Sequence, residues 1–450
     1  MRGKERGSAF AVIRDPLWDT IRIDPVAMRV VDADAFQRLR YIKQLGLAHL
    51  VYPGATHTRF DHALGVYHLA TRTIDALGDR LDGAGVDPVE RRLIPLAGLL
   101  HDVGHYPFSH ALEELDASRI PGHHEALVGR FLVDPEIRAA LGEVAENAWE
   151  RIEALVRGRS DSPLQGLVSG SLDLDKIEYL KRDARFCGVP YGEVDVDRLL
   201  HALDIVQDPE TGRLEVGVGE KGVAALESLL FAKYQMFRNV YWHHAVRAAT
   251  VMYKRMVADA LEAGLLDGDE LVGRTDESIL FLLEARAEGA EREAPSGAER
   301  VGAWVRALRR RRLPKRAAEV VAAELDGLDV GEWLTLDTAF KRRVEDRVAE
   351  ELGLQPGSAF LDYPEKSRMF GLDLLVRFQH GEVVRVGPGG RAGLIGLPQV
   401  ADELYRTARV LRLFTWPDRR SVEPAALASL ATKSEHEVRR RLEDHVPLLG

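Results

Sequence analysis

The sequence Leu99-Leu-His-Asp-Val-Gly-His-Tyr-Pro-Phe-Ser-His110 organises this 450-residue chain. An apolar helical run ends directly in His101 and Asp102, and a glycine and a proline then break the helix. Adjacent helical residues point about 100° apart, so both side chains can reach one metal ion only at a helix end. Because His105 and His110 follow on the broken turn, the pattern favours a metal or phosphate site over a histidine-rich surface loop.

Two further stretches place metal-ligand types near the beginnings of helices. Thr58–Gly65 carries His62 on the polar side of a predicted helix, where a surface histidine is the simplest interpretation. In Leu172–Tyr179, Asp173 is suited to an N-cap and Asp175 to the first turn, which the helix dipole favours. Neither stretch alone indicates a site. Together with the histidine–aspartate pair they supply two imidazoles and two carboxylates.

A mixed site of two imidazoles and two carboxylates suits Fe, Mn, Zn, Ni or Co, and the donor types do not choose among these metals. Such an ion lowers the pKa of a coordinated water and polarises a phosphoryl oxygen. Mg²⁺ is a further candidate, bound with the substrate phosphates. The pattern therefore predicts a divalent transition metal as the cofactor.

The composition excludes several other classes of protein. The net charge of −10 is not that of a generally basic nucleic-acid coat, and the single Cys187 excludes a disulfide scaffold and a cysteine-based zinc finger. Seven of the 15 histidines lie between residues 62 and 124, so the unusual feature is local. We see no apolar stretch of the ~18–20 residues that span a bilayer, and no apolar core of a secretory signal behind Met1–Arg6. We therefore expect a cytoplasmic protein.

Periodicity predicts a mainly α fold with a smaller α+β region at the C-terminal end. We expect an N-terminal β-hairpin segment (1–24), a helical domain (25–263) and an α+β region (264–450). The expected helices are one capped by Asp32 or Asp34 that carries Phe36, Leu39, Ile42 and Leu45, then Arg59–Leu77 with Thr58 as cap, Glu90–Leu100, His110–Leu115, His123–Leu132, Glu143–Val156, Asp173–Phe186, Val223–Ala263 and a final helix pair. The expected strands are Phe10–Arg14, Thr20–Ile23, Leu214–Val218, Leu372–Phe378 and Val383–Val386, and Glu284–Glu299 and Arg306–Arg316 are expected to be solvated helix faces or loops.

Long blocks around these residues carry a resemblance to a known family. The blocks are Phe36–Gly46, Tyr52–Gly65, His101–His110, His124-Glu125 and Asp173–Asp183. They resemble, in order, the HD-domain metal-dependent phosphohydrolases, and more narrowly the deoxynucleoside triphosphate (dNTP) triphosphohydrolases of the SAM-and-HD-domain type. The resemblance runs from about residue 10 to residue 260 and implies a helical HD-domain core.

The resemblance assigns roles to the clustered histidines and carboxylates. It implies that the metal ligands are His62, His101, Asp102 and Asp175. Histidine titrates near neutral pH, which makes His105, His110 and His124 candidates for proton transfer. The family pattern implies His110 as the general acid to the leaving 5′ oxygen. Glu113, where the compared enzyme has aspartate, lies about one helical turn after His110 and could orient it.

Other matched positions concern the substrate and a regulatory nucleotide. The resemblance implies that Arg59 and Lys176 contact phosphates, and that Gln44, Leu45, Tyr179 and Asp183 contact the sugar. It also matches Asp32, Gln37 and Arg40 to residues that bind an activating guanine nucleotide, although Ala11 stands where that family enzyme has a lysine.

One departure concerns the residues that grip phosphate and stack on the base. These two residues of the family enzyme, an arginine and a tyrosine, match Val240 and Ala248 of this chain, in the helix expected over Val223–Ala263. Arg238, Arg247 or Tyr241 could substitute from a neighbouring turn. Base preference is therefore left open.

These inferences predict a metal-dependent hydrolase that converts a dNTP and water to a deoxynucleoside and triphosphate. The alternatives are an HD-type phosphohydrolase for another phosphoester (a monophosphate, dinucleotide or cyclic nucleotide) and a non-catalytic nucleotide- or nucleic-acid-binding regulator. The resemblance further implies an activating nucleotide and a homo-oligomer, dimer or tetramer, as partners. No membrane partner is expected, and nucleic acid stays open as a partner.

Overall fold

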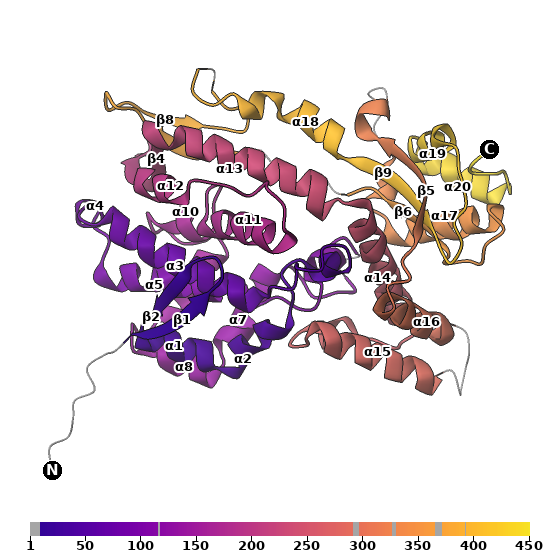
Figure 1. Cartoon of the computed structure of the whole chain (residues 1–450), viewed down its shortest axis with the longest axis horizontal. Helices are drawn as coiled ribbons and strands as arrows, with labels where there is room; N and C mark the ends of the chain where they lie inside the picture. Colours follow the sequence, from indigo (N-terminus) through magenta and orange to yellow (C-terminus); the bar gives the residue numbers. More distant parts are fainter. Residues whose placement is uncertain (1–9, 116–117, 291–296, 326–329, 365–370, 392) are drawn as a thin grey trace, which may run out of the picture.

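The computed structural model describes residues 10–115, 118–290, 297–325, 330–364, 371–391 and 393–450 (Figure 1). The charged start of the chain and part of the stretch 284–299 lie outside these residues. The described chain is mainly helical, as the sequence predicts, with three small sheets. None of its helices is long and apolar enough to cross a membrane.

The helices fall into two groups along the chain. Those before residue 203 are α1 (Pro25–Asp32), α2 (Asp34–Gln37), α3 (Arg59–Leu77), α4 (Arg80–Gly83), α5 (Pro88–Leu100), α6 (Ser109–Leu112), α7 (His124–Leu132), α8 (Pro135–Gly142), α9 (Ala148–Val156), α10 (Gln165–Val168), α11 (Leu174–Cys187) and α12 (Val196–Ala202). The later ones are α13 (Val223–Met236), α14 (His244–Glu262), α15 (Asp276–Ala290), α16 (Ala298–Arg309), α17 (Thr338–Glu351), α18 (Ala401–Ala408), α19 (Pro424–Ala431) and α20 (Glu435–Glu443).

Nine strands form three sheets in the described residues. They are β1 (Ala11–Asp15), β2 (Asp19–Ile23), β3 (Leu203–Gln207), β4 (Leu214–Gly219), β5 (Lys315–Val321), β6 (Ala359–Asp362), β7 (Leu374–Arg377), β8 (Val383–Val386) and β9 (Val410–Thr415). The predicted N-terminal hairpin is confirmed, because β1 and β2 pair antiparallel from Ala11 opposite Ile23. The other sheets have the orders β3-β4-β7-β8, with β4 and β7 parallel, and β5-β9-β6, which is antiparallel throughout.

Helix α3 has the bounds that the sequence predicts, for a local reason. The Thr58 hydroxyl accepts from the backbone N–H of Asp61, and the Asp61 carboxylate accepts from the backbone N–H of Thr58 at 2.8 Å. This capping box satisfies two of the N–H groups that a helix beginning leaves unpaired. Asp173 likewise caps α11 by accepting from the backbone N–H of Lys176 at 3.0 Å, as predicted. Local capping thus fixes where both helices begin, and hence where His62 and Asp175 lie.

Two helix predictions are wrong in extent, and the helix expected from Glu143 begins only at Ala148. The helix expected over Val223–Ala263 is broken, because a π-helical turn, Phe237–Tyr241, and the non-helical His243 separate α13 from α14. The helix expected from Asp32 or Asp34 to Leu45 is a four-residue α2 and a short 3₁₀ turn. Most apolar positions of these two segments are buried, although Leu45 is only partly buried and Phe231 is exposed. This burial explains why periodicity alone suggested longer helices.

The strand prediction for the later chain is incomplete. Strands β5, β6 and β9 were not expected, and neither was β3. The basic run Arg306–Arg316, expected as a solvated face or loop, spans the end of α16 and the beginning of β5. Strand β9 is buried along most of its length without alternation, so its pattern does not distinguish it from a buried helix.

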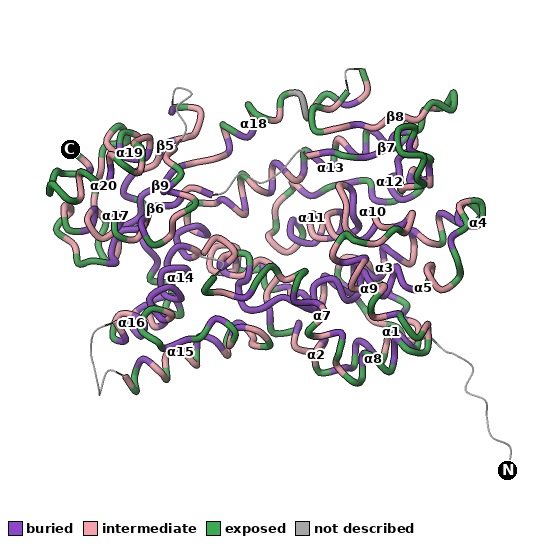
Figure 2. Tube along the Cα trace, turned by 180° about the vertical axis from the view of Figure 1, so that it is seen from behind, coloured by how far each residue is buried: buried purple, intermediate pink, exposed green. Residues whose placement is uncertain are grey.

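Part of the chain after residue 264 packs against the N-terminal half. Strands β7 and β8 join β3 and β4 in one sheet, and Figure 1 shows β4 and β8 on the side of α12, far from the C-terminus. Strands β5, β6 and β9 form a separate group with α17, α19 and α20, which shares its own apolar core. Helix α14 packs against β5 and β6 of this group and is buried along most of its length (Figure 2). The proposed boundary near 264 therefore has strands of one sheet on both sides.

A buried carboxylate at the beginning of α15 should make stability depend on pH. Burial, opposed by Lys43, raises the pKa of Asp276 to about 6. The folded state then holds this proton up to about pH 6 while the unfolded state loses it near pH 4, so stability falls as pH rises through that window. Asp276→Asn should raise the unfolding free energy at pH 7 by up to about 3 kcal/mol and flatten this part of the pH profile.

Urea denaturation at pH 4 and pH 7 measures this effect. The Asn oxygen can still accept the Lys43 backbone N–H, which Asp276 accepts at 2.9 Å. Exposed Asp79, changed to Asn, is the matched control and should leave both values unchanged. A lower stability of Asp276→Asn at pH 7 would contradict the raised pKa.

Candidate functional site

Four side chains from three helices bring their donor atoms together at one point. His62 comes from α3, His101 and Asp102 follow the end of α5, and Asp175 is in the first turn of α11. His62 Nε2 lies 3.2 Å from His101 Nε2 and 2.9 Å from Asp175 Oδ1. His101 Nε2 lies 3.3 Å from Asp102 Oδ1. Ligand atoms about 3.0–3.4 Å apart surround a metal ion with bonds of about 2.0–2.2 Å, so these spacings fit.

The hydrogen bonds of the two histidines also fit a cation at this point. His62 Nδ1 contacts the Glu178 carboxylate at 2.7 Å, and His101 Nδ1 donates to the backbone carbonyl of Gly98 at 2.8 Å. Both partners are acceptors, so each ring carries its proton on Nδ1 and turns the lone pair of Nε2 inward. Two lone pairs and two carboxylates then face one another. That arrangement is repulsive unless a proton or a metal ion lies between them.

The charges of the site lead to the same conclusion. Burial opposes protonation of His62, but hydrogen bonds to Asp175 and Glu178 raise its pKa to about 10. Burial likewise opposes ionisation of Asp102, but the Arg59 guanidinium, 2.6 Å away, holds its pKa well below the usual range. Without a metal the site therefore binds a proton tightly. The described residues form a His/Asp cluster that could bind a divalent metal ion, whose identity the donors leave open.

A buried network behind His62 was missed by sequence reasoning. Glu178, which orients His62, also accepts from Arg182 Nε at 2.8 Å and from Trp18 Nε1 at 2.9 Å. Arg182 in turn lies 3.0 Å from the Asp15 carboxylate of the N-terminal hairpin. Glu178 and Arg182 are four residues apart on α11, and this spacing was the available signal. The network orients a candidate ligand, as partners outside the ligand set commonly do.

Two glycines allow these close approaches. A Cβ atom on Gly65 would lie 2.0 Å from Glu178 Oε1, so only glycine on α3 leaves room for the carboxylate that reaches His62. A Cβ atom on Gly104 would lie 2.2 Å from the carbonyl oxygen of His124. Gly104 therefore lets α7 approach the turn after α5. Both glycines lie in or beside the matched blocks, and their role is close packing at normal backbone angles.

The predicted proton-transfer residues form a second cluster beside the first. Glu113 accepts from Nδ1 of His110 at 3.2 Å and from Nδ1 of His124 at 3.3 Å. Burial opposes ionisation of Glu113, but these hydrogen bonds hold its pKa well below the ordinary value. The longer side chain of glutamate therefore still reaches His110, as the spacing in the sequence suggested, and also reaches His124, which the sequence did not indicate.

His105 connects the two clusters. Its Nε2 lies 3.0 Å from Asp102 Oδ1, its Nδ1 lies 2.6 Å from the Ser109 hydroxyl, and its ring stacks on that of His124 with centroids 3.6 Å apart. Burial, Arg59 and His124 hold the pKa of His105 well below 6.5, so the ring is neutral at neutral pH. The buried His105 thus supports its neighbours, whereas His110 is exposed enough to meet a ligand.

Both clusters face one cavity of about 570 Å³. That volume lies in the usual range of small-molecule sites, about 300–1,000 Å³. Most of the site residues expected from the sequence line it: Gln44, Leu45, Arg59, Asp102, His105, His110, Glu113, His124, Asp175, Tyr179 and Asp183. His62 and His101 are buried behind this wall.

The structure shows where the residues lie that stand in place of the family's phosphate-binding arginine and base-stacking tyrosine. Val240 and Ala248 are buried in the apolar core, so neither replaces the missing arginine or tyrosine. The π-helical turn brings Tyr241 to the cavity wall, where its hydroxyl donates to Asp183 at 2.6 Å. His57, to which the sequence assigned no role, contacts the other oxygen of Asp183 at 2.8 Å. Arg247 also lines the cavity, whereas Arg238 does not.

Lys176 lies outside the cavity lining. Its ammonium group contacts the Asp173 carboxylate and the carbonyl of Gly170, the latter at 2.8 Å. Lys233 is nearby, since burial and the charge of Lys176 together lower its pKa to about 8. Two lysines therefore lie beside Asp175. The predicted contact of Lys176 with substrate phosphate stays a prediction that needs its side chain to turn.

The residues matched to a regulatory nucleotide lie away from the cavity. Asp32 and Arg40 are exposed, and the Gln37 side chain accepts from Arg40 Nε at 2.8 Å and donates to the Val31 carbonyl at 2.7 Å. The Arg40 guanidinium lies over the Phe60 ring, 3.5 Å from its centroid. These residues are grouped on the surface, so a ligand there would be separate from the catalytic cavity.

Comparisons with known proteins agree with this site. The HD domain family matches residues 59–177, which contain all four candidate ligands, and the HD associated region matches residues 194–387. An uncharacterized protein of Methanocaldococcus jannaschii is 34% identical over 60% of this chain and 54% of its own length. The deoxynucleoside triphosphate triphosphohydrolase SAMHD1 of Homo sapiens is 28% identical over 52% of this chain and 42% of its own length. The chain thus spans about half the length of these curated relatives.

A solved structure covers nearly the whole chain. The crystal structure of a hypothetical protein from Aquifex aeolicus matches 98% of this chain and 100% of its own, with a TM-score of 0.66 and 26% identity. The resemblance expected from the sequence is confirmed at the level of the family. The chain carries an HD domain followed by an HD-associated region, and its homologues include SAMHD1 triphosphohydrolases.

Proposed function

We propose that this protein is a metal-dependent dNTP triphosphohydrolase that releases a deoxynucleoside and inorganic triphosphate. One observation carries the proposal. Four inward-facing donor groups, those of His62, His101, Asp102 and Asp175, converge behind a cavity that also holds the His110–Glu113–His124 cluster. Metal-ligand and proton-transfer groups side by side are what hydrolysis of a phosphoester requires.

Different side chains of the protein would have different roles in this reaction. A divalent metal ion held by the four ligands supplies charge stabilisation at a phosphoryl oxygen and a more acidic water. Arg59, at the cavity wall, contributes a cation that matches phosphate oxygens in geometry. Glu113 holds Nδ1 of His110, so Nε2 of His110 is the nitrogen that protonates the 5′ oxygen as its bond to the α-phosphorus breaks.

Recognition of the nucleoside would fall to the other wall of the cavity. Gln44 has a buried side-chain oxygen without a hydrogen-bond partner among the described residues, which suits it to accept from a ligand hydroxyl. Tyr179 and Tyr241 line the same cavity and offer aromatic surface to a sugar or base. The hydrogen bonds from Tyr241 and His57 fix the Asp183 carboxylate for contact with the 3′-hydroxyl.

We further propose that a nucleotide bound near Asp32, Gln37 and Arg40 activates the enzyme in a homo-oligomer. The support is the resemblance together with the exposure of Asp32 and Arg40, because a ligand between subunits needs surface groups. Arg40 suits a phosphate, and Asp32 and Gln37 suit the edge of a guanine.

The deciding experiment separates this reaction from its alternatives. The metal-loaded protein is incubated with each dNTP singly and in mixtures, and the products are followed by chromatography. Release of triphosphate supports the main proposal, and release only in mixtures supports the activating nucleotide. Cleavage of a monophosphate, dinucleotide or cyclic nucleotide with no triphosphate in any mixture would contradict the main proposal and favour a phosphohydrolase for that other phosphoester. Nucleotide binding without any cleavage would favour a regulator.

His110→Asn should lower turnover by about 100- to 10,000-fold, the usual contribution of a general acid, while metal content stays the same. The imidazole is 59% exposed, its hydrogen bond is to Glu113, and its ring only edges against those of His105 and His124, so stability should change little. His380→Asn is the matched control, since His380 also pairs with a glutamate, Glu382, at 3.0 Å on an exposed turn. Turnover of His110→Asn equal to that of the control would remove His110 from the mechanism.

A further inference from the structure

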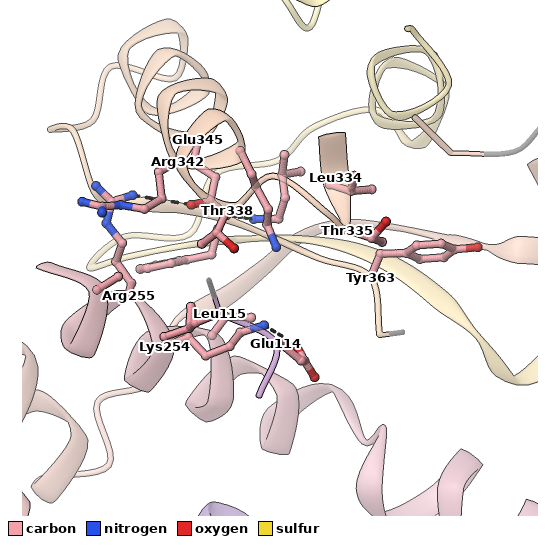
Figure 3. Close-up of a pocket in the computed structure, with 15 residues that line it drawn as sticks. Glu114, Leu115, Lys254, Arg255, Leu334, Thr335, Thr338, Arg342, Glu345 and Tyr363 are labelled. Atoms are coloured by element: carbon pink, nitrogen blue, oxygen red, sulfur yellow. Dashed lines mark hydrogen bonds and ion pairs between the residues drawn. The ribbon is translucent and has the colours of Figure 1, made fainter. Parts of the chain in front are cut away.

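A second cavity, of about 50 Å³, lies between α14 and α17 (Figure 3). Four cationic side chains line it: Lys254 and Arg255 of α14, and Lys341 and Arg342 of α17. Only two acidic side chains, Glu114 and Glu345, belong to the same lining. Glu114 also lines the catalytic cavity, so the two cavities share one side chain.

Three of the four cations have carboxylate partners. Lys254 contacts Glu114, and Arg255 lies 2.9 Å from both Asp259 and Asp346. Arg342 lies 2.8 Å from Asp259. Figure 3 shows Arg255 and Arg342 grouped beside Glu345, while Lys254 meets Glu114 on the opposite side of the cavity. Each of these three cations therefore has at least one carboxylate partner in the protein.

Lys341 is different. Among the described residues its ammonium group makes no hydrogen bond and no ion pair. Glu345, one turn further along α17, instead accepts the backbone N–H of Leu361 at 2.8 Å. Burial and the charge of Lys254 lower the pKa of Lys341, although Glu345, Asp362 and Glu114 oppose this shift. A cation that is partly dehydrated and unpaired next to a second cation is best stabilised by an anion.

The shape of the cavity limits what the anion can be. Pockets that hold a whole small molecule measure about 300–1,000 Å³, so only a small group enters here. Thr338 adds a hydroxyl in the first turn of α17, where the helix dipole favours negative charge. Phosphate combines a small size with several acceptor oxygens, which matches two ammonium groups and a hydroxyl.

We propose that this cavity binds a single phosphate group through Lys341, Lys254 and Thr338. The group is either free orthophosphate or the terminal phosphate of a larger molecule that extends into solvent. This site adjoins the catalytic cavity, with which it shares only Glu114, and it does not depend on the reaction proposed above.

Calorimetric titration of the full-length protein with orthophosphate, and separately with a nucleoside 5′-diphosphate, tests the proposal. Lys341→Met should lose one class of phosphate site, with at least a tenfold loss of affinity, and Lys341→Arg should retain it. Lys176→Met should keep this site, because Lys176 lies beside the metal centre. Exposed Lys221, changed to Met, is the control for loss of one lysine.

Each outcome has one meaning. Lys341-dependent binding of orthophosphate supports a free-ion site, and Lys341-dependent binding of the diphosphate alone supports a terminal phosphate. Binding of both ligands with the same affinity and stoichiometry in Lys341→Met as in the unmodified protein would overturn the proposal, as would no binding of either. The thermal unfolding temperature of Lys341→Met should not fall, because methionine removes a partly buried, unpaired charge. Loss of binding therefore cannot be assigned to unfolding.

Discussion

Asp102→Ala is expected to remove bound metal and turnover together, with turnover reduced at least about 1,000-fold. The carboxylate is one of four candidate ligands, 3.3 Å from His101 Nε2. Charge stabilisation by a metal ion is worth several kcal/mol, and about 4 kcal/mol corresponds to a factor of 1,000. Metal content by elemental analysis and turnover with the substrate found in the product assay measure the two effects.

The Asp102 variant needs two controls because the residue also pairs with Arg59 at 2.6 Å. Asp102→Asn keeps the shape and one acceptor, so it separates loss of the ligand charge from loss of packing. Asp79→Ala removes an exposed aspartate and should retain both metal and turnover. If Asp102→Ala keeps its full metal content, the assignment of this ligand is wrong, whatever happens to turnover.

Arg182→Met is expected to destabilise the folded protein by about 3–5 kcal/mol, the usual result of leaving a buried charge without its partner. Arg182 is fully buried and pairs with Glu178 and Asp15 at 2.7 and 3.0 Å. Its removal takes away the cation that the two buried carboxylates share. Because Glu178 also holds His62, metal affinity should fall about 10- to 100-fold.

Arg157→Met offers a closely matched control. Arg157 and Glu153 have the same four-residue spacing and also lie 2.7 Å apart, but their side chains are 29% and 23% exposed. Such a pair usually contributes less than about 1 kcal/mol. Urea denaturation and metal titration of both variants measure the difference. Similar small losses in the two variants would contradict the role of the buried network.

The metal site could be predicted from the sequence to a large degree because its determinants are local. Thr58 and Asp61 cap α3, Asp173 caps α11, and the break after Leu100 ends α5 next to His101. Each of these signals lies within a few residues of the feature that it fixes. Four candidate ligands on three helix ends could therefore be named before the fold was known, with the family resemblance joining them.

Other features were decided by contacts between distant parts of the chain. The π-helical turn that brings Tyr241 to the cavity interrupts an apolar pattern that is continuous in the sequence, so periodicity predicted a single helix. Glu178 reaches His62 only because Gly65 of another helix leaves room for it. Strands β7 and β8 join β3 and β4 across about 160 residues, and no local signal specifies that pairing.

The sequence by itself determined the helical class, the beginnings of the helices that carry the candidate ligands, and the donor types of the metal site. Only the tertiary structure decided which charges are paired. Arg59 is held by Asp102 and Lys176 by Asp173, while Lys341 is left without a partner among the described residues. The physical reason is the distance along the chain over which each interaction acts. Capping and amphipathic periodicity act within one or two turns, whereas burial and ion pairing depend on which distant segments pack together.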